Sequence, residues 1–116
     1  MALPQPKPLP NASDPAELME QARKASDMLK ALSHETRLLI LCILAEGEKS
    51  VSELEEILSM PQATVSQQLA RLRFDRLVNA RRDGRMIFYS IADEEVSSVI
   101  ATLYELFCRP VRNIDG

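Results

Sequence analysis

The chain has 116 residues, of which 46% are hydrophobic and 4% are aromatic, and its formal net charge is −3. This length suits a single domain, and the absence of a long apolar run excludes a membrane span. The N-terminus also lacks the apolar segment of a signal peptide, so we expect a cytoplasmic protein.

The net charge is unevenly distributed along the chain. Residues 59–91 contain six arginines and two aspartates, which gives this stretch +4 and leaves −7 on the remainder. A phosphate responds to charges within about one Debye length, ~8–10 Å, so a local basic patch matters more than the total. The pattern favours an acidic body with one nucleic-acid-binding face.

The two ends of the chain are expected to lie outside the folded domain. Residues 1–13 contain prolines at positions 4, 6, 8 and 10 and should form an extended, disordered tail. The domain is expected to span residues 14–109, and a loose tail to span 110–116. The domain opens with a helix, because Asp14 can cap it and Pro15 suits its first position. A thin apolar stripe then repeats at helical spacing, at Leu18, Ala22, Ala25, Leu29 and Leu32. This stripe suits packing within the same subunit or against a second subunit.

The next two helices should form the centre of the domain. Ser33 is expected to cap a helix over 34–45, which is apolar nearly all round and therefore central. Ser50 and Glu53 form a capping-box pattern that opens a third helix, which runs through Leu58.

The fourth helix, expected over 61–74, carries two distinct faces. Val65, Leu69 and Leu72 form one narrow apolar stripe. The other faces carry small, amide or basic side chains that can hydrogen-bond base edges in a major groove: Gln62, Ala63, Thr64, Ser66, Gln67 and Arg71. Such a helix is expected as the second helix of a helix-turn-helix.

A basic hairpin is predicted directly after this helix. Residues 77–82 and 86–91 are β-prone, and Asp83-Gly84 between them supplies the positive φ of a tight turn. Arg81, Arg82 and Arg85 surround the tip and suit phosphates or a minor groove. The alternative is an amphipathic helix followed by an unrelated solvated hairpin.

A final helix completes the predicted fold. Asp93 should cap it, and Arg109-Pro110 should end it. Its apolar stripe is expected at Val96, Val99, Ile100, Leu103 and Phe107. The order is four helices, two strands and one helix, so the fold class is mainly α with a small β-hairpin, a winged helix-turn-helix.

Three stretches resemble the ArsR family of bacterial repressors. Residues 31–41 resemble the opening of its second helix, 64–72 its recognition helix and 77–85 its wing, and the match runs from about residue 17 to 108. The resemblance implies a homodimer built through the first and last helices. It also implies a protein that is not an enzyme, binds double-stranded operator DNA and releases it when an inducer binds.

The same resemblance bears on the inducer. Metal sensors of the family often carry Cys-x-Cys on the third helix or Asp and His ligands along the last one, and this chain has neither pattern, so we expect no metal and no cofactor. One cysteine in the second helix and one at the end of the last resemble the family's persulfide-sensing branch. That resemblance implies that Cys42 and Cys108 are sensing thiols, which repress when reduced and release DNA when reactive sulfur species bridge them.

The residues themselves leave alternatives open. Helical wheels place Cys42 at the edge of the core and Cys108 on the flank of the last apolar stripe, but spacing alone cannot bring the two together. They could instead be inert cysteines that fill small apolar spaces. Other functions remain open at this point: a metalloid- or oxidant-responsive repressor, a thiol oxidoreductase, or a winged-helix module that binds proteins rather than DNA.

Overall fold

The computed structural model describes residues 14–112, so the tail predicted over 1–13 and residues 113–116 lie outside the described part of the chain. The elements, in order, are α1 (Pro15–Leu32), α2 (Glu35–Leu44), β1 (Lys49–Ser50), α3 (Val51–Leu58), α4 (Gln62–Phe74), β2 (Val78–Asp83), β3 (Met86–Ile91) and α5 (Glu94–Leu103), followed by a π-helical turn, η1 (Tyr104–Cys108), and a 3-10 turn, η2 (Arg109–Val111).

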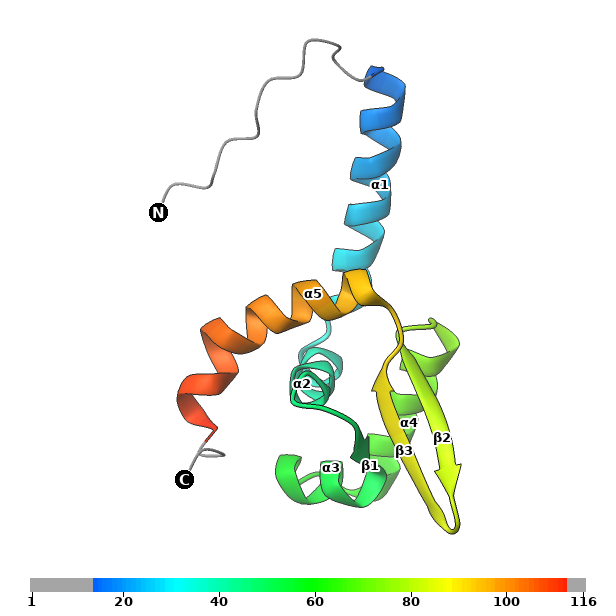
Figure 1. The fold of residues 1–116 in the computed structure, drawn as a ribbon, viewed down its shortest axis with the longest axis vertical. Coiled ribbons are helices and arrows are strands. Elements are labelled where there is room, and N and C mark those ends of the chain that lie inside the picture. Colours follow the sequence, from blue (N-terminus) through cyan, green and yellow to red (C-terminus); the bar gives the residue numbers. More distant parts are fainter. Residues whose placement is uncertain (1–13, 113–116) are drawn as a thin grey trace.

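The fold is a winged helix-turn-helix, as predicted (Figure 1). Helices α3 and α4 lie to one side of α2, and α5 crosses above it. The strands form an antiparallel sheet of order β1-β3-β2, so the predicted two-stranded hairpin is in fact part of a three-stranded sheet. Lys49 pairs with Tyr89 and Ser50 with Phe88, which joins the wing to the start of α3.

Helix α2 is the centre of the core, as its sequence predicts. Five consecutive residues from Ile40 to Leu44 are buried. Around them pack buried side chains from the neighbouring elements, chiefly Leu32, Leu54, Val65, Leu69, Leu72, Leu77, Val78, Val96, Ile100 and Tyr104. Burying a side chain of this size contributes about 1.5–3 kcal/mol, so this cluster fixes the position of α4 on the domain.

The helix caps mostly follow the sequence signals. Asp14 accepts from the Ala16 amide at 3.0 Å, and the capping box between Ser50 and Glu53 is complete, with bonds of 2.9 and 3.1 Å. Ser33 is an exception, since its hydroxyl donates to the Lys30 carbonyl at 2.8 Å and closes α1. The N-cap of α2 is therefore the following residue, whose side chain makes no capping bond.

The end of the last helix differs from the prediction. After Leu103 the chain makes a π-helical turn, in which the Arg109 amide bonds the Tyr104 carbonyl. The wider turn advances the inward-facing position by one residue, so Cys108 packs against the core and Phe107 is 69% exposed. Phe107 was therefore wrongly assigned to the apolar stripe. Beyond the expected boundary at residue 109, the chain continues in a 3-10 turn that ends at Val111.

Helix α1 projects from the rest of the molecule (Figure 1). Leu18, Met19 and Leu29 are 57%, 71% and 61% exposed, and Leu32 alone along this helix is buried. Apart from Leu32, the large side chains of the apolar stripe therefore do not pack within the described part of their own subunit. Among residues 14–112, no helix has the length and hydropathy needed to cross a membrane.

Candidate functional site

The outer face of α4 presents the predicted polar side chains. Val65, Leu69 and Leu72 are fully buried and anchor the helix from beneath. Ser59 adopts the left-handed conformation at the end of α3, with φ 52°, and turns the chain toward α4. Thr64 is half-buried and the other predicted contact residues are exposed, namely Gln62, Ala63, Ser66, Gln67 and Arg71. This is the arrangement that a major groove can receive.

The wing carries two unpaired arginines at its tip. The strands pair as far as Asp83 with Met86, so the loop contains two residues, Gly84 and Arg85. Only Gly84 has positive φ, at 64°, which is the pattern of a type II′ turn. Arg82 and Arg85 are exposed and have no partner within the described residues, so both can take a phosphate.

Arg81, which is predicted to contact DNA with them, is paired with an acidic side chain in the structure. Its guanidinium makes two bonds of 2.7 Å to Glu48 and lies 4.6 Å from the centroid of the Phe88 ring. The carboxylate raises the pKa of Arg81, and the arginine in turn lowers that of Glu48. Glu48 therefore offsets the charge of Arg81, and the pair links β2 to the residue before β1.

A second ion-pair group supports α4 from its C-terminal end. Asp75 caps this helix and lies 3.4 Å from Arg71 and 3.5 Å from Arg37. Arg37 is buried, and it also donates to the Ala31 carbonyl at 2.8 Å. The contact with Asp75 leaves the Arg71 side chain 64% exposed.

The two cysteines meet at one cavity. Cys42 is 4% exposed on α2, and Cys108 is half-buried at the end of the π-helical turn. Both line an apolar cavity of about 270 Å³ between α2 and the C-terminal helix, together with Glu35, Leu38, Leu39, Leu103 and Phe107. Burial, followed by the adjacent Cys108 thiol, raises the pKa of Cys42 to about 12. Cys42 is therefore a protonated thiol at neutral pH, and it lies deeper than the edge-of-core position that the helical wheel gives.

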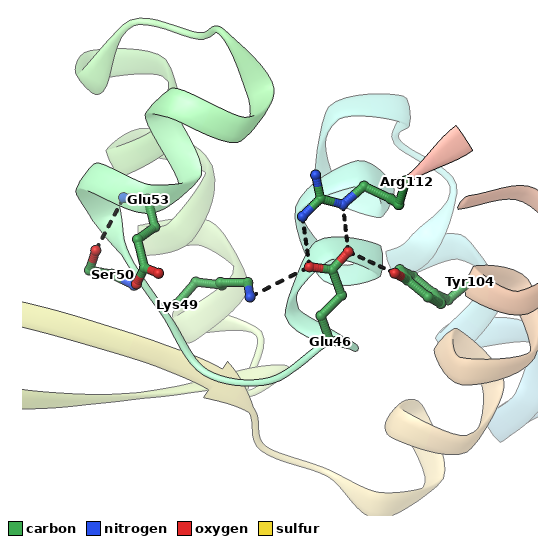
Figure 2. A network of polar contacts seen from close by, with 6 residues as sticks. All are labelled: Glu46, Lys49, Ser50, Glu53, Tyr104 and Arg112. Atoms are coloured by element: carbon green, nitrogen blue, oxygen red, sulfur yellow. Dashed lines mark hydrogen bonds and ion pairs between the residues drawn. The ribbon is translucent and has the colours of Figure 1, made fainter. Parts of the chain in front are cut away.

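A polar network beside the cavity has no counterpart in the sequence analysis (Figure 2). The Glu46 carboxylate accepts from the Tyr104 hydroxyl at 2.7 Å and from Arg112 at 2.6 and 2.9 Å, and Lys49 lies 3.5 Å away. Arg112 is the main cause that lowers the pKa of Glu46 to about 2. Tyr104 and Arg112 lie 58 and 66 residues from Glu46 in the sequence, so only a three-dimensional structure could bring them to its carboxylate.

The described residues also bear on metal ligation. Within 14–112, no three side chains of His, Cys, Asp or Glu gather closely enough to hold a metal ion. Cys42 and Cys108 have an acidic neighbour, Glu35, at the rim of the cavity, but no histidine lines it.

Comparison with known proteins gives a consistent result. Residues 34–80 match the family described as bacterial regulatory protein, arsR family. The biofilm growth-associated repressor of Agrobacterium fabrum is 42% identical over 93% of each chain. The transcriptional activator HlyU of Vibrio cholerae is 42% identical over 80% of this chain and 86% of its own.

Solved structures agree with these relatives. The reduced form of Vibrio cholerae HlyU superposes with a TM-score of 0.73 at 42% identity, covering 80% of this chain and 98% of that one. The transcriptional repressor BigR of Xylella fastidiosa superposes with a TM-score of 0.77 at 37% identity, covering 84% and 96%. The winged helix, the exposed polar face of α4 and these similarities together show that the chain belongs to the ArsR family and is a DNA-binding transcriptional regulator, not an enzyme.

Proposed function

We propose that this protein is a repressor that senses sulfide-derived persulfides through Cys42 and Cys108 and releases operator DNA when the two thiols are bridged. The proposal rests on one observation: two free cysteines from distant parts of the sequence line the same apolar cavity. Cysteines that only fill small apolar spaces are not expected to line the same cavity, and this one also opens to solvent.

The location of the thiols suggests an order of reaction. Cys108 is the more exposed, so it meets the reagent first, and the protonated Cys42 acts second. Cys108 attacks the outer sulfur of a persulfide RSSH and forms Cys108–SSH while RSH leaves. Cys42 then attacks the inner sulfur and gives up its proton to the departing HS⁻, so that one persulfide and two thiols give a disulfide, RSH and H₂S. If both cysteines first become persulfides, their condensation gives a trisulfide and H₂S.

The regulator is proposed to act as a homodimer in the cytoplasm. Exposed apolar side chains on α1 and on the C-terminal turns suit burial against a second copy, and they include Leu18, Met19, Leu29, Leu106, Phe107 and Val111. A two-fold dimer would present two α4 helices to a pseudo-palindromic site. A cytoplasmic pair of thiols is normally reduced, so that bridging is a signal rather than a scaffold.

The experiment compares DNA affinity before and after bridging. An operator duplex is selected from random sequences with the reduced protein, and its Kd is measured for wild type, Cys42→Ser and Cys108→Ser, with and without glutathione persulfide. Bridged wild type should bind about 5–150-fold more weakly, which is the usual size of a coupling between two sites. Both single mutants should keep binding. DNA release by either mutant would overturn the two-thiol mechanism.

Parallel treatments separate the alternatives within the family. Hydrogen peroxide tests a general oxidant sensor, and arsenite tests a metalloid sensor that would bind the same two thiols. Intact mass after each treatment identifies the adduct, because retained sulfur adds mass to the bridge while a direct disulfide removes two hydrogens. If arsenite or peroxide releases the DNA and persulfide does not, that reagent replaces persulfide as the inducer.

A further inference from the structure

Cys108 lies between two residues that the same carboxylate holds. Tyr104 comes four residues before it and Arg112 four residues after it, and both bond the side chain of Glu46. Glu46 follows Cys42 by four residues and lies in the turn just after the end of α2. The carboxylate therefore ties the segment that carries Cys108 to the turn that closes α2, the helix that carries Cys42.

The contact is strong enough to hold that segment. The Glu46 side chain is 6% exposed, and Arg112 engages both of its oxygens. Its pKa of about 2 keeps it ionised at neutral pH. Separation of the segment would break the hydrogen bond from Tyr104 and both charge-assisted bonds from Arg112, so it is unfavourable. Figure 2 shows Tyr104 and Arg112 converging on this carboxylate from the C-terminal segment.

The backbone between the two contacts does not fix Cys108 by itself. Cys108 closes a π-helical turn and precedes a 3-10 turn, and both are less regular than an α-helix. The two residues before Cys108, Leu106 and Phe107, are 60% and 69% exposed, so their side chains anchor this segment only weakly. The contacts to Glu46 therefore bracket the segment on both sides of the thiol.

We propose that Glu46 is a positioning residue for the thiol switch, because it holds Cys108 beside Cys42 in the reduced protein. The inference rests on the proposed function for its biological meaning. The effect of Glu46 on the alignment of the two thiols can be measured without DNA or persulfide. The positioning role of Glu46 and the proposed function can therefore fail separately.

The probe is glutathione disulfide. The thiolate of Cys108 attacks one of its sulfurs, forms a mixed disulfide and releases one glutathione. Cys42 then attacks the Cys108 sulfur, closes the internal disulfide and releases the second glutathione, so that the two thiols are oxidised as the reagent is reduced. Acid quenching and intact mass give the ratio of internally bridged protein to mixed disulfide, and this ratio reports how well the thiols are aligned.

The variants are Glu46→Gln and Arg112→Gln, each alone and together, with Glu105→Gln as the matched control. Glu105 pairs with Arg109 on the same segment, but both side chains are exposed. We expect the bridging ratio to fall about tenfold in each single variant, since small misplacements have large effects on such internal reactions. The bridging ratio of the double variant should fall no further, because both changes remove the same contact between Glu46 and Arg112. The control should match wild type.

Unfolding midpoints of each reduced variant in urea separate positioning from simple destabilisation. A lower midpoint with a wild-type bridging ratio in Glu46→Gln and Arg112→Gln would overturn the inference. A reduced ratio in these variants, measured well below their unfolding midpoints, supports it. If bridged wild type keeps its DNA affinity, the proposed function fails, but the bridging ratio still decides the role of Glu46.

Discussion

Glu46→Gln should change the pH dependence of stability in a defined way. The pKa of Glu46 falls from 4.5 to about 2 on folding, chiefly because Arg112 bonds its carboxylate. At about 1.4 kcal/mol per pKa unit, ionisation contributes about 3 kcal/mol to the free energy of unfolding at neutral pH. The contribution is complete above the unfolded pKa near 4.5 and is lost as the pH falls from there toward 2.

The assay is urea unfolding of wild type and Glu46→Gln between pH 7 and pH 2.5, at one fixed protein concentration. The difference in unfolding free energy should be largest at neutral pH and should shrink below pH 4.5. Glu105→Gln removes an exposed ion pair and should change stability by less than about 1 kcal/mol. A difference for Glu46→Gln that stays constant from pH 7 to pH 2.5 would refute the reasoning, because it would show that the ionised carboxylate is not the stabilising species.

Three further predictions concern DNA binding and backbone strain. Gln67→Ala should weaken operator binding by about 1–3 kcal/mol and relax base preference, which a binding selection would detect. Arg82→Ala and Arg85→Ala should weaken binding to all DNA sequences equally, and each should lower the slope of log affinity against log salt concentration by about one unit. Arg81→Ala should leave that slope nearly unchanged, because Glu48 already neutralises the Arg81 side chain. Arg76→Gly should raise the free energy of unfolding, measured by urea denaturation, by about 1 kcal/mol. Arg76 has φ 61° in the turn that closes α4, a conformation that strains arginine but not glycine.

The sequence predicts elements whose signals are local. The polar face and apolar stripe of α4, the capping box at Ser50 and the turn at Gly84 each lie within a few residues, and the structure confirms all three. Local patterns suffice here because helix periodicity and capping depend on neighbours along the chain.

The features that the sequence does not predict depend on distant partners. Strand β1 has two residues and exists only because β3 lies beside it. The Arg81–Glu48 pair spans 33 residues and the Arg112–Glu46 pair spans 66. The shared cavity of Cys42 and Cys108 likewise follows from the packing of α2 against the C-terminal turns, which no periodicity reveals.

The order of the strands means that the arginines of the wing also affect aggregation. Because the order is β1-β3-β2, strand β2 forms an outer edge of the sheet, with backbone groups on one side that another chain could bond. Charged side chains along such an edge discourage strand addition between molecules, and β2 carries Arg81, Arg82 and Asp83. The positive charges that suit a phosphate therefore also oppose aggregation. Selection for solubility and selection for DNA contact would favour the same residues, and arginine-depleted variants of this strand would be prone to self-association even without DNA.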